Sequence, residues 1–175
     1  MAAQRAKVPI AIHLDHCQSA EMGRYAADNL PFDSIMVDMS HCEKAENLAL
    51  TKELVPYCHE RGIATEAEPG RIEGGEDGVA DTADLTGMLT TPDEVEDFID
   101  TGVNFLAPAI GNIHGEYGSR GPRLEFDRLD SIYETCKKRD VRVVLRGTND
   151  FPEALMLQCI KGGVSKVNVN KHGLG

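Results

Sequence analysis

At 175 residues, the chain is long enough for a single domain over 1–175 with a sizeable hydrophobic core. Its 18 basic and 29 acidic residues give a formal net charge of −11, which argues against nucleic acid and anionic membranes as partners because both need clustered positive charge. Five dispersed cysteines, a start too polar for a secretory signal and the lack of a membrane-length apolar run predict a cytoplasmic protein with reduced thiols.

Short apolar runs that end in polar residues alternate with helical patterns along the chain. The apolar runs cover 8–15, 34–38, 63–68, 104–110, 141–145 and 164–169, and the helical patterns cover 19–30, 43–59, 92–100, 126–139 and 152–160. This alternation is typical of a parallel sheet covered by helices, either a barrel or an open doubly wound sheet. We favour the barrel because all six strand ends are polar. Since a TIM (β/α) barrel has eight strands, we expect an incomplete barrel, with two strands supplied from elsewhere or a shortened chain.

The first apolar run ends in three polar residues, His13, Asp15 and His16, that are costly to bury. At the end of a buried strand, such groups are retained when they bind each other, a metal or a ligand. His13 and Asp15 share one face of the predicted strand, whereas His16 points elsewhere or begins the loop. For this cluster alone, a structural hydrogen-bonded pair is about as good an explanation as metal or proton chemistry.

The other strand ends carry a second histidine and several carboxylates. His114 lies between glycines after the fourth run, and neutral imidazoles near carboxylates suit zinc or a similar divalent ion. The carboxylates that follow strands are Asp15, Asp38, Glu66 and Glu68. We interpret the remaining histidines as structural: His41, His59 and His172.

Two loops allow either a functional or a structural interpretation. The glycine-rich acidic segment 70–78 has the composition of a mobile lid that would carry Glu76 to the site, although an ordinary surface loop explains it better on composition alone. Segment 147–150 precedes a predicted helix and could bind an anion at the helix start. An N-cap formed by Asn149 or Asp150 is an equally good explanation.

Matching segments in family order extend over nearly the entire chain: VPIAIHLDH, SIMVDMSH, ENLALTKELV, ATEAEPG followed by GGEDG, TGVNFLAPAIGNIHGEYG and GGVSKVNVN. The chain thereby resembles the class II, metal-dependent fructose-bisphosphate aldolases. The resemblance implies a TIM barrel with Zn²⁺ that cleaves fructose 1,6-bisphosphate, or a related ketose bisphosphate, to dihydroxyacetone phosphate and glyceraldehyde 3-phosphate. Family members are commonly dimers or larger, which allows a homodimer here.

The resemblance also implies roles for individual residues. His16 and His114 would ligate zinc, with Glu68 and Asp38 at or near a metal position. Asp15 would exchange a proton with the substrate hydroxyl as the carbon–carbon bond breaks, and Glu76 would handle the carbon-bound proton. The substrate and its phosphate would be bound by Gly115, Arg146, Gly147, Asn149, Asn168 and Lys171.

Three departures from the family pattern leave an alternative open. The family's third zinc-binding histidine, in an LHG segment, is here Arg146, which has no free lone pair for a metal. The phosphate loop reads Thr148-Asn149-Asp150, and two strands and a C-terminal helical extension are missing from the match. The alternative is a catalytically impaired or non-catalytic relative that binds sugar phosphate or a partner. A metal-dependent hydrolase on the same fold has no support beyond generic ligands.

Overall fold

The computed structural model describes residues 5–72, 79–80, 89–119 and 121–169. Within these residues, six parallel strands form one sheet and a strand pair forms a second, small sheet. The six strands are β1 (His13–Cys17), β2 (Ser34–Val37), β3 (Ala64–Ala67), β5 (Phe105–Leu106), β7 (Arg142–Leu145) and β8 (Val164–Val167). The small sheet, which the sequence did not predict, pairs β4 (Val79–Ala80) with β6 (Glu116–Tyr117). The helices are α2 (Ala20–Asn29), α3 (Lys44–His59), α4 (Pro92–Ile99), α5 (Phe126–Lys138) and α6 (Glu153–Lys161).

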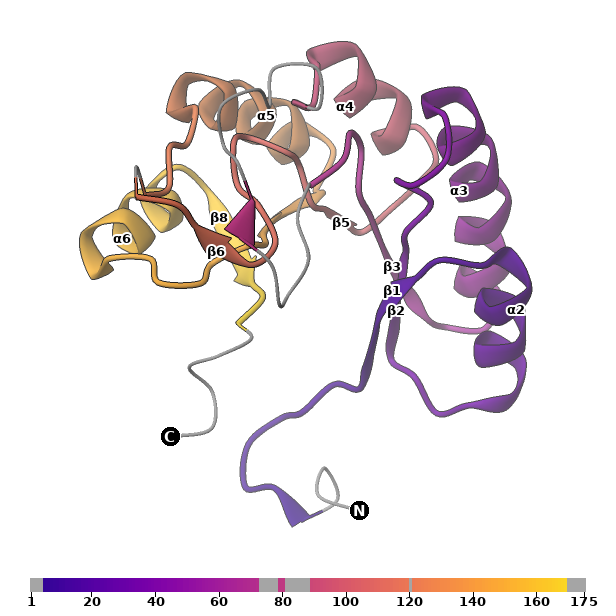
Figure 1. Cartoon of the computed structure of the whole chain (residues 1–175). Helices are drawn as coiled ribbons and strands as arrows, with labels where there is room; N and C mark the ends of the chain where they lie inside the picture. The colour runs from indigo at the N-terminus through magenta and orange to yellow at the C-terminus, as the bar shows by residue number, and fades with distance from the viewer. Residues whose placement is uncertain (1–4, 73–78, 81–88, 120, 170–175) are drawn as a thin grey trace.

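The strand order distinguishes the barrel from the doubly wound sheet. The order β1-β2-β3-β5-β7-β8 follows the chain without a reversal, and every pairing is parallel. A doubly wound sheet would reverse its order at a switch point. Right-handed crossovers that always advance in one direction place all the helices on one face, and Figure 1 shows them around the outside of a curved sheet. The expectation of an incomplete barrel is confirmed.

The first strand begins later than the apolar run predicted. Val8 and Ile10 are 67% and 52% exposed, and β1 starts at His13. Backbone pairing to the next strand starts at Ile12, whose carbonyl accepts from the amides of Asp33 and Ser34. Residues 8–11 precede this pairing, and β1 is an edge strand of the described sheet, so their apolar side chains stay outside the core. The prediction of a buried strand from residue 8 was therefore wrong.

The core lies between the sheet and its outer helices. One cluster of buried side chains joins α4, α5 and α6 to the second half of the sheet, and another joins α2 and α3 to the first half. The start of α4 follows sequence rules: Thr91 Oγ1 accepts from the Glu94 amide, and Glu94 Oε2 accepts from the Thr91 amide, which is a capping box. None of the helices in the described residues is long and apolar enough to cross a membrane. The packing leaves the carboxyl ends of the strands together at one rim.

Candidate functional site

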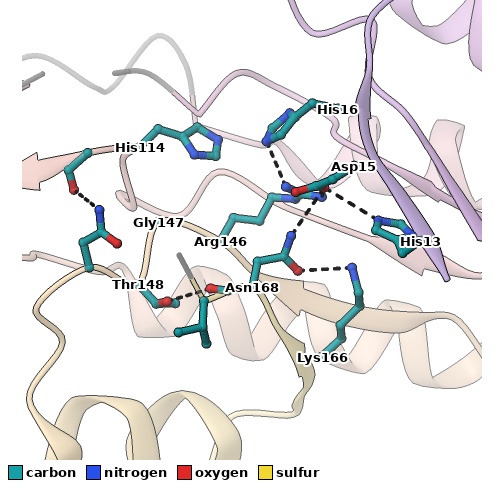
Figure 2. Close-up of a pocket in the computed structure, with 12 residues that line it drawn as sticks. His13, Asp15, His16, His114, Arg146, Gly147, Thr148, Lys166 and Asn168 are labelled. Carbon is teal, nitrogen blue, oxygen red and sulfur yellow. Dashed lines mark hydrogen bonds and ion pairs between the residues drawn. The ribbon is translucent and has the colours of Figure 1, made fainter. Parts of the chain in front are cut away.

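A pocket of about 330 Å³ opens where the strands β1, β7 and β8 end (Figure 2). Side chains predicted from sequence make up most of its lining: Asp15, His16, His114, Gly115, Arg146, Gly147, Asn149 and Asn168. Four further residues line it: His13 and Thr148, which belong to the polar cluster after the first run and to segment 147–150, and Lys166 and Val169, for which the sequence predicted no role. Glu76 and Lys171 lie outside the described residues. Residues from opposite ends of the chain thus meet at the rim where a barrel places its active site.

His16 is held in one orientation by its neighbour on the next strand. Its backbone has a positive φ of 48°, at an irregularity in the β1–β2 register. The ring Nδ1 lies 2.6 Å from Asp38 Oδ2, and the other oxygen of Asp38 accepts from the Ser40 amide and hydroxyl. Burial opposes ionisation of Asp38, but these hydrogen bonds outweigh it and hold the pKa well below its usual range. The Asp38 carboxylate therefore orients His16 and leaves ring Nε2 on the pocket side.

Three side chains converge as a possible metal centre. Ligand atoms of His16, Glu68 and His114 all lie within 4.8 Å of one another. Among the described residues, Glu68 Oε2 and His114 Nε2 are buried and have no hydrogen-bond partner. Burial lowers the pKa of His114 to about 4, so this imidazole is neutral at physiological pH, which is the form that binds metals. Two imidazoles and a carboxylate are a ligand set that zinc accepts.

Arg146 lies beneath the pocket at the centre of a buried charge network. Its side chain is 1% exposed, and Nε and Nη2 both donate to Glu66 Oε1, at 3.0 and 2.6 Å. Nη2 also donates to Asp15 Oδ1 at 2.6 Å, while Lys166 Nζ pairs with the other oxygen of Glu66. Two cations thereby balance two anions, which offsets part of the desolvation penalty of burying Arg146 and Glu66.

One further contact of Arg146 reaches the metal-ligand candidates. Its Nη1 lies 3.0 Å from His16 Nε2. Figure 2 shows the guanidinium side by side with Asp15 and His16, with His114 facing them. The Arg146 side chain thus contacts both a predicted catalytic carboxylate and a predicted zinc ligand.

Side-chain amides and hydroxyls tie the loop after β7 to two neighbouring loops, the one before β6 and the one after β8. Asn149 Nδ2 donates to the Gly115 carbonyl, and Thr148 Oγ1 donates to the Asn168 carbonyl. Helix α6 starts after Pro152 without a side-chain cap bond. The alternative in which Asn149 or Asp150 is the N-cap is therefore wrong, because Pro152 occupies that position. Asn149 instead connects two loops of the pocket wall.

Gly147 brings two of these loops into close contact. Its φ is +64°, and a Cβ at this position would lie 2.1 Å from the Ile113 carbonyl oxygen. Gly147→Ala is expected to reduce the free energy of unfolding by about 2 to 5 kcal/mol, from backbone strain plus steric overlap. Gly62→Ala is a matched control, because Gly62 has φ +73° with nothing within 4 Å of its Cβ position, and should cost about 1 to 2 kcal/mol. Urea denaturation measures the free energy of unfolding of both variants. Equal losses in the two variants would show that the steric overlap at Gly147 is relieved without cost.

Comparison with known proteins shows the family of the chain. The family model for class-II fructose-bisphosphate aldolase matches residues 1–174. The chain belongs to this aldolase family. It is 57% identical to a Coccidioides immitis protein named "Putative fructose-bisphosphate aldolase", over 97% of this chain and 58% of that protein. The chain therefore spans little more than half the length of this curated relative.

Solved aldolase structures share the fold of this family member. A crystal structure from Coccidioides immitis, described as a candidate fructose-1,6-bisphosphate aldolase, matches with a TM-score of 0.88 and 60% identity, over 97% of this chain and 59% of that one. The YdjI aldolase of Escherichia coli K12 matches with a TM-score of 0.74 and 31% identity, over 95% and 55%. The fructose-bisphosphate aldolase of Campylobacter jejuni, at 21% identity, shares the fold with a TM-score of 0.67, over 95% and 53%. The family resemblance drawn from the sequence motifs is confirmed.

Proposed function

We propose that this chain carries the site of a zinc-dependent aldolase that cleaves fructose 1,6-bisphosphate, or a related ketose bisphosphate, to dihydroxyacetone phosphate and glyceraldehyde 3-phosphate. Family membership supports the reaction class. The observation that carries the proposal is the convergence of His16, Glu68 and His114, with two buried atoms that have no hydrogen-bond partner in the described residues. Buried polar atoms without partners are rare in folded proteins, and a bound ion would satisfy these.

The residues at the rim fit zinc once one contact is released. Glu68 Oε2 and His114 Nε2 are available, whereas His16 Nε2 accepts from Arg146. When bound, zinc supplies Lewis-acid polarisation of the substrate carbonyl. In this proposal Asp38 is not a direct ligand, because its carboxylate is already bonded to His16 and Ser40.

Asp15 is suited to accept the proton of the substrate hydroxyl as the carbon–carbon bond breaks. Its side chain is 48% exposed and lines the pocket. Burial alone would raise its pKa, but hydrogen bonds with His13 and Arg146 outweigh this and keep the pKa well below its usual range. The carboxylate is therefore ionised at neutral pH, but its low pKa makes it a weak base, so proton uptake requires the Arg146 contact to loosen when substrate binds. Glu76 is proposed, as the sequence indicates, to return a proton to carbon.

The phosphate groups of the substrate would meet the loops after β7 and β8. Gly115, Gly147, Asn149 and Asn168 line this side of the pocket, together with Lys166. Lys166 is 28% exposed, and its ammonium group contacts Asn168 Oδ1 at 3.1 Å. A partly exposed cation beside backbone amides of a glycine turn suits a phosphate. Lys171 joins this set as a proposal from the sequence. The cytoplasmic location and the homodimer also stay predictions.

The buried Arg146 supports a second candidate function. A relative that binds sugar phosphate without zinc would keep the pocket and its phosphate loops while the guanidinium holds His16 Nε2. Zinc binding separates the two candidates, since only the aldolase requires the metal.

Metal content of the folded chain tests the proposal. Protein stripped with EDTA is incubated with zinc, freed of excess ion by gel filtration and analysed for zinc per chain. One tightly bound ion is expected in the wild type and a large loss in His114→Ala. His41→Ala is the matched control, because His41 is exposed and outside the pocket, and should retain the ion. Equal zinc contents in the two variants would contradict the proposed ligands.

A further inference from the structure

The contact between Arg146 and His16 determines the protonation pattern of the imidazole. An arginine side chain can only donate hydrogen bonds. His16 Nε2, 3.0 Å from Arg146 Nη1, must therefore accept, and Nδ1 carries the ring proton toward Asp38 at 2.6 Å. In this contact His16 directs the lone pair of Nε2 at the guanidinium. A zinc ion bound by His16 on the pocket side would need that same lone pair.

We propose that Arg146 is a built-in competitor of zinc, whose Nη1 holds the His16 Nε2 lone pair and must leave it before the metal can bind. This inference rests on the proposed function, since it presumes that His16, Glu68 and His114 form the metal centre. It assigns to Arg146 control over metal occupancy, which differs from the substrate-binding role predicted from the sequence.

The contacts of the guanidinium allow this exchange without unfolding the network. Nε and Nη2 form one edge of the planar group and both donate to Glu66, whereas Nη1 is at the opposite corner. A tilt about the Glu66 edge removes Nη1 from His16 while the buried ion pair is kept. Glu68 Oε2 and His114 Nε2 have no hydrogen-bond partner within the described residues, so these two atoms hold no contact that must be released to receive the ion.

The same geometry makes zinc binding weaker than in a site without the arginine. Release of Nη1 costs a hydrogen bond from a charged donor, which corresponds to about a tenfold to hundredfold loss of affinity. A fixed positive charge that stays next to a divalent cation adds to this loss. The competitor is held in place by its other partners, since Arg146 also donates to Asp15 and is 1% exposed.

Zinc affinity of matched variants tests the proposal. Competition with a chromophoric chelator gives the zinc dissociation constant of the wild type, Arg146→Met, Arg146→His and Lys166→Met, each shown to be folded by circular dichroism. Lys166→Met is the control, because Lys166 pairs with the same Glu66 but has no contact with His16 among its hydrogen bonds. We expect Arg146→Met to bind zinc about ten to a hundred times more tightly and Arg146→His to bind more tightly still. Lys166→Met should change the zinc affinity by less than about threefold, because its ammonium group has no hydrogen bond with His16 and is partly exposed to solvent.

The possible outcomes separate this inference from the proposed function. Equal gains in Arg146→Met and Lys166→Met would overturn the competition, because they would reflect charge alone. An unchanged affinity in Arg146→Met would overturn it as well and leave the zinc site standing. Lack of zinc binding in every folded variant would instead overturn the zinc-dependent function and the inference with it.

A measurement on the wild-type chain covers the case in which the Arg146 variants do not fold. Nitrogen-15 NMR follows the Arg146 guanidinium and the His16 ring during a titration with zinc. We expect both sets of signals to change together at the same zinc concentration. Zinc-induced changes at His16 and His114 with an unaltered Arg146 guanidinium would overturn the proposal.

Discussion

Glu66→Gln is expected to lower the free energy of unfolding by about 3 to 5 kcal/mol, because it breaks a buried ion pair and leaves charges without compensation. Glu66 is fully buried and binds Arg146 through one oxygen and Lys166 through the other. Glutamine keeps the shape of the side chain but removes the negative charge between two cations. Denaturation in guanidinium chloride, followed by circular dichroism, measures the loss.

A surface ion pair provides the matched control for this variant. Glu125, which is half exposed, accepts from Arg128 at 2.8 Å on the outside of the molecule. Glu125→Gln makes the same chemical change and should cost less than about 1 kcal/mol, because solvent screens the pair. If Glu66→Gln costs no more than Glu125→Gln, the buried charge network around Arg146 does not stabilise the fold.

Asp15→Asn is expected to reduce kcat for cleavage of fructose 1,6-bisphosphate by about 100-fold to 10,000-fold, the usual range for loss of a general acid–base group. Asparagine fills the same volume and can still contact Arg146, but it cannot take up the proton of the substrate hydroxyl. The effect should appear in kcat far more than in KM. Kinetics of the zinc-loaded chain, with product dihydroxyacetone phosphate detected enzymatically, give both constants.

The control for Asp15→Asn is the same substitution away from the pocket. Asp28 lies on α2 and binds Tyr57 and Arg61 at the outer surface. Asp28→Asn should leave kcat within about twofold of the wild type, as expected for a surface change remote from the site. A kcat for Asp15→Asn that is also close to the wild-type value would exclude Asp15 as the group that accepts the proton.

The polar ends of the apolar runs allowed the site to be predicted from sequence. In a parallel sheet whose order follows the chain, all carboxyl ends meet at one rim, so Asp15, His114 and Asn168 had to lie near one another. Lys166 was missed, although the signal was present: it is two residues before Asn168 in β8, and alternate residues of a strand face the same side.

Other features depended on contacts between residues far apart in the sequence, which no local sequence pattern reveals. The sequence showed that Arg146 cannot ligate a metal, but its bonds to Asp15 and His16 join residues about 130 positions apart. The late start of β1 also escaped prediction, because an apolar run does not reveal where a neighbouring strand begins to pair. The buried position of Arg146 thus had to come from the structure.

Cleavage of fructose 1,6-bisphosphate by the purified, folded chain, with and without EDTA, tests the central claim most directly. We expect turnover that EDTA abolishes and that added zinc restores, because His16, Glu68 and His114 would hold the metal despite the nearby Arg146. Absence of turnover from folded, zinc-loaded protein, or turnover that EDTA leaves unchanged, would contradict a zinc-dependent aldolase site in this chain.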